Sequence, residues 1–598
     1  MDFLHRSSLF IETSLMKTPL AFLLISISIL ANNVYSQPDI DFFDSKDSSR
    51  YSTDNSIING KQNNRFDNQP ILTIKTFKLS EFPDLTPYDI NHDDLLNICK
   101  DSLKDNKNRY TIDRLNQLTN KLTKHLRKQG MILARVFIPE QNIINQSVRL
   151  ELVEGSIQAI NSTQLLKTKN SSDLYHNDTL IRPFKRLINK ASFRPELESS
   201  MIRLSQYPGL KTQTQFQPSS EPGKTQLNIK VIKQNRFEGY LTFDNFGSEY
   251  TGAYRVLATG KINNITGNAD RLSLGLMATL DPTNSYFGSF DYSLPLESTI
   301  SNDSFFSFVN PIFTHGLLFN LGVQQNTYTV GKELEALNIK GEATTNYYAI
   351  KRPWILNNSI QFYSSIQLDL KKAISKQNGK LIDEDKLTII SFINSLHFND
   401  RLINAASNTV TFNIHQGLED SLGSLKIGEP NSRSGRELGY APPDFTKYAV
   451  GFSRLQQIDS FQLFAKFNYQ HSDDTLLSLE QIALGGPHAV RGYSTADYTA
   501  DSAFQTTIEL IGKSYAGKLS LPIDNLTAAV FMDYAIGWRN DALANEIDSS
   551  HLLAVGWYAD FIKKEKFQTR LQMGFPLSDT KPVNGNSVQF FLSVQRRF

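Results

Sequence analysis

The sequence contains a single cysteine, Cys99, among 598 residues. One cysteine cannot form a disulfide within the chain, and no Cys/His cluster has the spacing of a zinc site. The formal net charge is only +2, which gives no argument for nucleic acid as a partner. Mean hydropathy is −0.33, too polar for a bundle of membrane helices. We therefore expect no disulfide framework, no metal and no nucleic acid.

Motifs of the common enzyme classes are missing as well. The chain has no Gly-rich loop followed by Lys and Ser/Thr, no His-Glu-x-x-His and no Gly-x-Ser-x-Gly. We therefore expect no enzymatic activity and no cofactor. Cys99 falls in a predicted helix, where a lone cysteine is expected to be a small core residue.

Long hydrophobic runs are almost absent. The one continuous apolar run, 19–31, is shorter than the roughly 20 residues that span a bilayer. Lys17 precedes it and the small-residue segment 34–36 follows, which favours a secretory signal peptide over residues 1–36 rather than a buried helix. Residues 37–70 are rich in Asp, Ser, Asn and Gln and predict a polar linker.

The segment 71–155 has the pattern of a small α+β domain. A stripe at spacings of three and four predicts a helix that starts after an N-cap at Thr111 and ends before Gly130. Alternation over 147–153 predicts a strand, and the whole order is β-α-α-β-β. The stripe expected to be buried consists of Ile112, Leu115, Leu118, Leu122 and Leu126.

The segment 156–234 repeats this order more loosely. Helices are predicted over 180–190 and 195–206, and a hairpin is predicted across Pro222-Gly223. The repetition indicates two related domains, and the alternative is two unrelated small α+β domains. A chain of this length is expected to hold two or three domains.

From 235 to 598 the chain predicts strand after strand. Leu272, Leu274 and Leu276 alternate with polar or small residues, and the chain ends in an alternating strand at Phe598. One apolar and one polar face fit a membrane β-barrel. The 39 Phe and 23 Tyr fit its aromatic girdles, although a soluble all-β protein would also alternate. A terminal edge strand ending in Phe would invite aggregation in a soluble protein, which favours closure into a barrel.

The most informative motif is Val490-Arg491-Gly492-Tyr493, which follows two glycines in a segment rich in Gly, Ser, Thr and Asp. A cation between a β-branched residue and glycine, next to an aromatic, suits a loop tip that folds back onto an acid. Asp533 in Phe531-Met532-Asp533-Tyr534 is the candidate acid. The alternative is an ordinary exposed loop with an unpaired Arg491.

These motifs resemble the POTRA-plus-barrel superfamily of outer-membrane proteins, and within it the TpsB transporters of two-partner secretion. The segments 134–141 and 153–155 look like the first POTRA domain of that family, and Phe598 looks like its assembly signal. The resemblance implies a transmembrane β-barrel of sixteen antiparallel strands over 235–598, preceded by two periplasmic α+β POTRA domains over 71–155 and 156–234. Length alone fits fourteen or eighteen strands equally well, at about 9–11 residues each.

The resemblance also assigns the motif residues. It implies that Val490, Arg491, Gly492 and Tyr493 form a lumen loop, whose Arg491 pairs with Asp533 of a wall motif that begins at Phe531. Here Ala535 stands where that motif has its glycine, and Gly537 follows two residues later. Relatives carry a plug helix near the mature N-terminus, and residues 37–70 show no amphipathic period to support one.

The function implied is transport across the outer membrane of a large unfolded exoprotein, a TpsA-like adhesin, haemolysin or contact-dependent toxin. The implied further partners are the barrel-assembly machinery and outer-membrane lipid. A barrel-assembly factor would share the barrel and the loop but usually carries more POTRA units. A diffusion porin would need no POTRA region at all.

Overall fold

The computed structural model divides into two compact units, with the boundary between Gln234 and Asn235. The predicted signal peptide, 1–36, and the linker, 37–70, lie outside the described residues. The structure describes residues 71–79, 85, 90–164, 175–190, 194–221, 223–281, 285–296, 316–433, 439–512, 523–543, 546–564 and 566–598.

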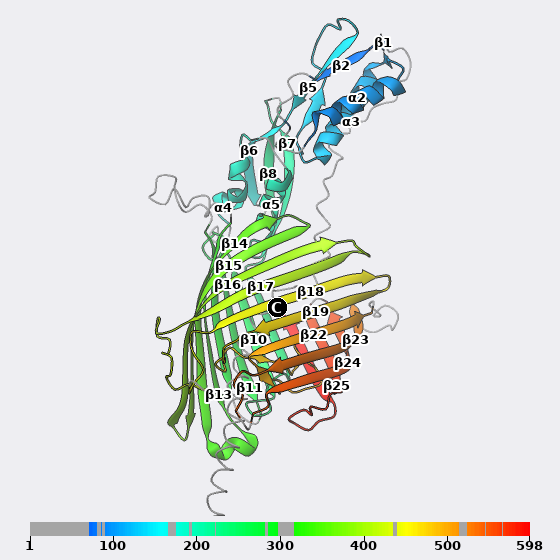
Figure 1. Cartoon of the computed structure of the whole chain (residues 1–598). Helices are drawn as coiled ribbons and strands as arrows, with labels where there is room; N and C mark the ends of the chain where they lie inside the picture. Colours follow the sequence, from blue (N-terminus) through cyan, green and yellow to red (C-terminus); the bar gives the residue numbers. More distant parts are fainter. Residues whose placement is uncertain are drawn as a thin grey trace, which may run out of the picture. The chain divides into compact units, whose positions relative to one another are not determined.

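The N-terminal unit begins with a three-stranded sheet of order β2-β5-β4, on which two helices pack (Figure 1). Strand β5 lies in the middle, parallel to β2 and antiparallel to β4. A short pair, β1 with β3, adjoins it. The elements are β1 (Leu72–Thr73), β2 (Thr76–Leu79), α2 (His92–Asp105), β3 (Arg109–Tyr110), α3 (Ile112–Lys128), β4 (Arg135–Phe137) and β5 (Ser147–Val153).

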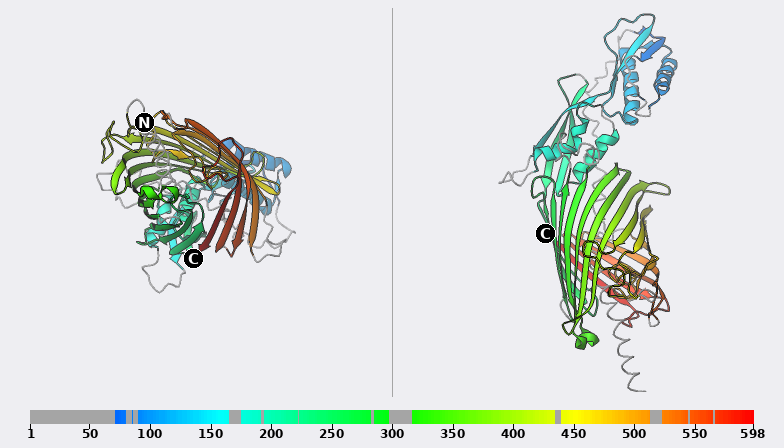
Figure 2. Two further views of the ribbon diagram at one scale, coloured as in Figure 1. Left: turned by 90° about the horizontal axis from the view of Figure 1, so that it is seen from below. Right: turned by 60° about the vertical axis from the view of Figure 1, so that its left-hand side comes forward.

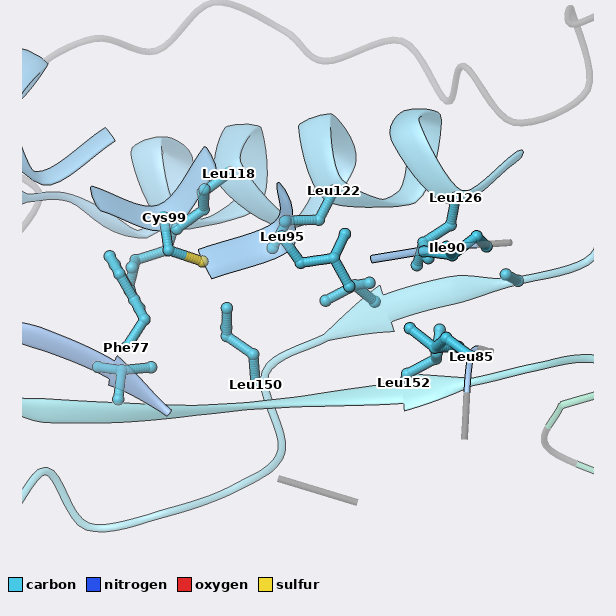
Figure 3. Close-up of a cluster of buried hydrophobic side chains, with 14 of the residues drawn as sticks. Phe77, Leu85, Ile90, Leu95, Cys99, Leu118, Leu122, Leu126, Leu150 and Leu152 are labelled. Atoms are coloured by element: carbon cyan, nitrogen blue, oxygen red, sulfur yellow. The ribbon is translucent and has the colours of Figure 1, made fainter. Parts of the chain in front are cut away.

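Helix α3 supplies much of the core of this part. The hydroxyl oxygen of Thr111 accepts a hydrogen bond from the backbone N–H of Arg114 at 3.4 Å, as the predicted N-cap requires. Leu122 and Leu126 are fully buried over the sheet (Figure 3). The prediction was wrong for Ile112, which is 53% exposed, because it is the first residue of the helix and precedes the turns that pack on the sheet.

Cys99 lies on α2 and is buried in this core, as expected (Figure 3). Burial raises the pKa of its thiol to about 11. Since only the thiolate is nucleophilic, we expect Cys99 to react with maleimide at pH 7.5 at least a hundredfold more slowly in the folded protein than in 6 M guanidinium chloride. Mass spectrometry over a time course measures this rate, and equal labelling in the two conditions would contradict the buried site.

The second sheet of this unit has the order β6-β8-β7, with β6 parallel and β7 antiparallel to β8. The predicted helix 180–190 was wrong in its extent, since it consists of a short α-helix and a 3-10 helix that contains Pro183, a residue without a backbone donor. Among the described residues, no helix is long and apolar enough to cross a membrane. The elements are β6 (Ser156–Gln164), α4 (Asn177–Ile181), η4 (Arg182–Leu187), α5 (Arg194–Ser205), β7 (Leu210–Pro218) and β8 (Lys224–Gln234).

The second unit is a closed antiparallel barrel of sixteen strands, which confirms the strand number implied by the resemblance (Figures 1 and 2). The wall consists of β9 (Phe237–Asp244), β10 (Tyr254–Asn263), β11 (Arg271–Leu280), β12 (Tyr286–Pro295), β13 (Leu318–Thr329), β14 (Ile339–Leu356), β15 (Ile360–Gln377), β16 (Lys380–Asp400), β17 (Ala406–Leu418), β18 (Thr446–Ile458), β19 (Phe461–His471), β22 (Ser502–Ile511), β23 (Asn525–Trp538), β24 (Ser549–Lys563), β25 (Phe567–Pro576) and β26 (Gln589–Arg597).

Alternation along the strands separates an outer face from a lumen face, as the sequence predicts. On β11 the side chains of Leu274 and Leu276 are 44% and 67% exposed, whereas Met277 points inward and is buried. The first and last strands close the barrel, with Asp244 of β9 opposite Ser593 of β26. Closure leaves the wall without a free sheet edge.

Candidate functional site: the lumen loop and its contacts with the wall

The site is built on the connection between β19 and β22, residues 472–501, which we call the lumen loop. Two short strands within it, β20 (Ile482–Ala483) and β21 (Thr499–Ala500), pair antiparallel and form the stem of a hairpin. Val490-Arg491-Gly492-Tyr493 lies at its tip. Near the stem, Gly486 has a φ of +116°, a conformation that favours glycine.

Arg491 of the tip contacts Asp533 on the inner face of β23. Its Nε and Nη2 donate to the two carboxylate oxygens of Asp533, each at 2.7 Å, and its backbone N–H donates to Oδ2 at 3.1 Å. Asp533 is fully buried and Arg491 is 5% exposed. A bidentate, charge-assisted pair away from water fixes both the position and the orientation of the tip.

A second acid, Glu509 of β22, completes the contact. Its Oε1 accepts from Arg491 Nη1 at 2.7 Å, and its Oε2 accepts from the hydroxyl of Tyr558 at 2.9 Å. The guanidinium also lies 3.5 Å from the ring centroid of Phe531, a cation–π geometry. Arg491 is therefore held by two carboxylates and an aromatic face from two neighbouring strands.

Sequence reasoning named Phe531 and Asp533 but missed Glu509. In the register of the wall, Glu509 lies opposite Phe531, and both point into the lumen. The sequence did carry a signal for Glu509. It is a charged residue between Ile508 and Leu510, and alternation along the strand places it on the face opposite to these two apolar residues.

The other tip residues pack against the wall. Tyr493 is fully buried, and its hydroxyl lies 2.5 Å from Ser578 Oγ and donates to the carbonyl of Thr580 at 3.1 Å. Val490 is buried in an apolar cluster that includes Ala535, the residue that replaces the expected wall glycine.

The tip backbone comes very close to β25. A Cβ built on Gly574 would lie 2.0 Å from the carbonyl oxygen of Arg491, and one on Gly492 would lie 2.7 Å from Ala554 Cβ. These glycines leave the space into which the tip fits. Phe598 is not part of this site, because its backbone N–H donates to the carbonyl of Gly239 at the seam of the barrel.

Comparison with known proteins gives the following matches. Residues 223–557 match the family model described as "Haemolysin secretion/activation protein ShlB/FhaC/HecB", and residues 92–155 match "POTRA domain, ShlB-type". The heme/hemopexin transporter protein HuxB of Haemophilus influenzae (strain 86-028NP) is 25% identical over 495 residues, which are 81% of each chain. The outer membrane transporter CdiB of Dickeya dadantii (strain 3937) is 22% identical over 390 residues, 64% of this chain and 63% of the relative.

Among solved structures, CdiB from Escherichia coli superposes with a TM-score of 0.66 at 17% identity, covering 90% of this chain and 92% of the other. CdiB from Acinetobacter baumannii gives a TM-score of 0.58 at 16% identity over 89% and 91% of the two chains. At such identities the likeness shows the fold alone. It is a fold in which α+β domains precede a barrel.

Proposed function

The chain belongs to the haemolysin secretion/activation protein family, and from this membership we propose that it exports one large unfolded exoprotein, an adhesin, haemolysin or contact-dependent toxin. It is a two-partner secretion transporter of the outer membrane, with its POTRA domains in the periplasm. Members of the family are transporter proteins for exoproteins. The observation that carries our proposal is the lumen loop, which is held against the wall of a closed barrel by Arg491.

In this proposal the lumen loop is the movable element of the pore. The tip of the lumen loop around Arg491 leaves its place when cargo enters, and the contacts of Arg491 with Asp533 and Glu509 define the position to which it returns. The gross attraction of one such ion pair, at about 4 Å and an effective dielectric near 20, is roughly 4 kcal/mol. Desolvation of the two charges offsets much of this. The contact therefore positions the loop, and cargo can displace it.

Cargo is captured by the POTRA domains as an extended segment. The sheet β6-β8-β7 has β7 at one edge, and this strand runs over the nine residues Leu210–Pro218. An edge of this length offers backbone donors and acceptors to an added strand. An apolar groove beside α3 is the alternative binding site. The periplasm supplies no ATP, so the direction of transport needs another source. Folding of the cargo outside the cell provides it, because the folded cargo cannot pass back.

We propose the following division of the chain into segments. Residues 1–36 are a signal peptide, 37–70 a linker or plug segment, 71–155 and 156–234 the POTRA domains, and 235–598 the barrel. During biogenesis the terminal strand, with its C-terminal aromatic, is recognised by the barrel-assembly machinery, and the apolar outer face then contacts outer-membrane lipid.

The test compares the secreted and outer-membrane proteomes of the native host carrying the wild-type gene, a deletion, or the deletion complemented with the wild type. We expect one large protein to disappear from the medium or the cell surface in the deletion, with other barrels unchanged, and to return on complementation. Depletion of many outer-membrane barrels would identify an assembly factor instead. An unchanged exoproteome would contradict the proposal.

A further inference from the structure

The base of the lumen loop carries a second charged contact at Glu480, eleven residues before Arg491 of the tip. Glu480 is 4% exposed. Its Oε1 accepts from Lys371 Nζ and its Oε2 accepts from Lys447 Nζ, each at 2.7 Å, and Lys447 also donates to the backbone carbonyl of Glu480 at 3.2 Å. Lys371 lies on β15 and Lys447 on β18, which are separated in the wall by two strands. Glu480 therefore joins parts of the wall that strand pairing does not join directly.

The other end of the loop has a buried carboxylate too. Asp501 is fully buried, and its Oδ1 accepts from Arg433 Nη1, from Gln481 Nε2 at 2.9 Å and from the backbone N–H of Leu476 at 3.2 Å. Its Oδ2 accepts from the backbone N–H of Asn540 at 2.8 Å. Arg433 belongs to the connection between β17 and β18, and Asn540 to the connection between β23 and β24. One carboxylate thus ties together three connections of the barrel.

Apolar packing strengthens the base. Leu476, Leu477 and Leu479 of the lumen loop are buried in one cluster with Leu387 and Ile389 of the inner face of β16. To withdraw the base, this cluster would have to open and two buried carboxylates would have to leave their partners. The loss of a partner from even one buried ion pair is strongly destabilising, because it leaves an uncompensated charge away from water.

Among the described residues, the tip is held by neighbouring parts of the wall only. Arg491 contacts Glu509 and Asp533 of the adjacent strands β22 and β23, and Tyr493 contacts Thr580 in the connection after β25. A cavity of about the size of one water molecule lies beside it, lined by Lys466 and Asn468 of β19, Gln505 of β22 and the loop residues His488 and Ala489. Movement of the tip would therefore break contacts with this part of the wall alone. The chain between each carboxylate and Arg491 is long enough for such movement, since about ten extended residues reach roughly 30 Å, the thickness of the membrane core.

We infer that Glu480 and Asp501 are positioning residues that fix the two ends of a moving hairpin, residues 482–500, and that the base stays in place while cargo passes. The role of this movement in transport rests on the proposed function. The contacts that fix the base do not depend on that function, so the movement of the hairpin is measured first without cargo.

Two engineered disulfides separate the base from the tip. Ser432 Oγ and Ser478 Oγ lie 3.1 Å apart, so Ser432→Cys with Ser478→Cys tethers the base to the β17–β18 connection. Gly492→Cys with Ala554→Cys tethers the tip after a small shift, because the two Cβ atoms need to separate by about 1 Å and a Cβ at Gly492 would also lie 2.9 Å from the backbone nitrogen of Pro576. Cys99 stays in place because it is buried. The reduced form of each protein is its own control.

The readout is the ionic current through the purified full-length protein in planar lipid bilayers. We expect the oxidised base tether to keep the frequency of current fluctuations within twofold of its reduced form. The oxidised tip tether should lower that frequency at least tenfold, reversibly with reductant. An equal loss of fluctuations in the oxidised base tether would overturn the inference. Secretion of cargo by the same variants is scored separately, so a failure of the transport proposal is visible as the absence of cargo export by the wild type.

Glu480→Gln tests the base directly, because it keeps the shape of the side chain and removes the charge that both Lys371 and Lys447 contact. We expect the mean current to rise at least threefold, and Glu480→Asp, which keeps the charge, to restore most of the wild-type value. Heat-modifiable migration on SDS gels confirms that each barrel is folded. A wild-type current in folded Glu480→Gln would overturn the role given to Glu480.

Discussion

Asparagine in place of Asp533 is expected to free the tip of the lumen loop and to reduce export of the cargo at least tenfold. Asp533 accepts three hydrogen bonds from Arg491 and is fully buried. An amide keeps the size of the side chain, but it loses the charge and turns one donor group toward the guanidinium. Removal of one charge of a buried pair typically costs about 3–5 kcal/mol. Glu509 stays 2.7 Å from Arg491 and retains part of the contact, so we expect a loss at the lower end of this range.

The matched control is Asp400→Asn. Asp400 accepts from Arg454 Nη1 at 2.6 Å and from Nη2 at 3.1 Å, a similar bidentate pair on the barrel that makes no contact with the lumen loop among the described residues. Both side chains of this pair are partly exposed, at 22% for Arg454 and 17% for Asp400. An ion pair that water reaches contributes little to stability, because solvent screens the attraction.

Export is measured by quantifying the cargo in the medium, and the position of the tip by its digestion with an added protease in intact cells. We expect Asp533→Asn to lower export and to make the loop sensitive to cleavage, and Asp400→Asn to resemble the wild type in both assays. Equal export by the two variants would show that the contact of Arg491 with Asp533 has no role in transport.

Some residues of this site could be predicted from the sequence, because their role depends on local sequence and less on the three-dimensional fold. The tip could be identified from Val490 to Tyr493 because a short motif next to glycines carries its own local geometry. Asp533 was the candidate acid from the sequence, and the resemblance assigned it to Arg491, although Ala535 replaces the expected glycine. The structure shows why this replacement is tolerated, since the Ala535 methyl group packs into the apolar cluster around Val490.

Glu509 and the base of the loop could not be predicted in the same way. Glu509 reaches Arg491 because β22 pairs with β23 in one particular register. Glu480 meets Lys371 and Lys447 only after the wall has closed and brought three distant segments together. A register and a closure are collective properties of many strands, and a single sequence position carries little information about them.

The number of strands in the barrel could not be predicted from the residues either. Alternation predicted the two faces of the wall, but chain length fitted fourteen, sixteen or eighteen strands. The reason lies in strands such as β14, β15 and β16, which run for 18, 18 and 21 residues. Strands of this length exceed the roughly 9–11 residues that cross the membrane, so residues per strand are not a fixed divisor.

Valine in place of Gly574 is expected to exclude the tip from its site without changing any charged residue. A Cβ at this position would lie 2.0 Å from the carbonyl oxygen of Arg491 and 2.8 Å from the backbone nitrogen of Gly492. Both are backbone atoms of the tip, so they cannot rotate away as the end of a side chain can. The barrel itself can fold with valine, which is favourable in strands. The loop must move instead, and the guanidinium of Arg491 then no longer contacts the carboxylate of Asp533.

The control for this change is Gly260→Val on β10, because a Cβ at Gly260 would meet no heavy atom within 4 Å. Both variants place the same β-branched side chain on a strand of the same wall. We expect Gly574→Val to lower export at least tenfold and to expose the loop to protease, as Asp533→Asn does, and Gly260→Val to match the wild type. The double variant with Asp533→Asn should be no worse than either single one, because both act by displacing the same tip. Additive losses in the double variant would mean that Gly574 affects export by another route than the position of Arg491.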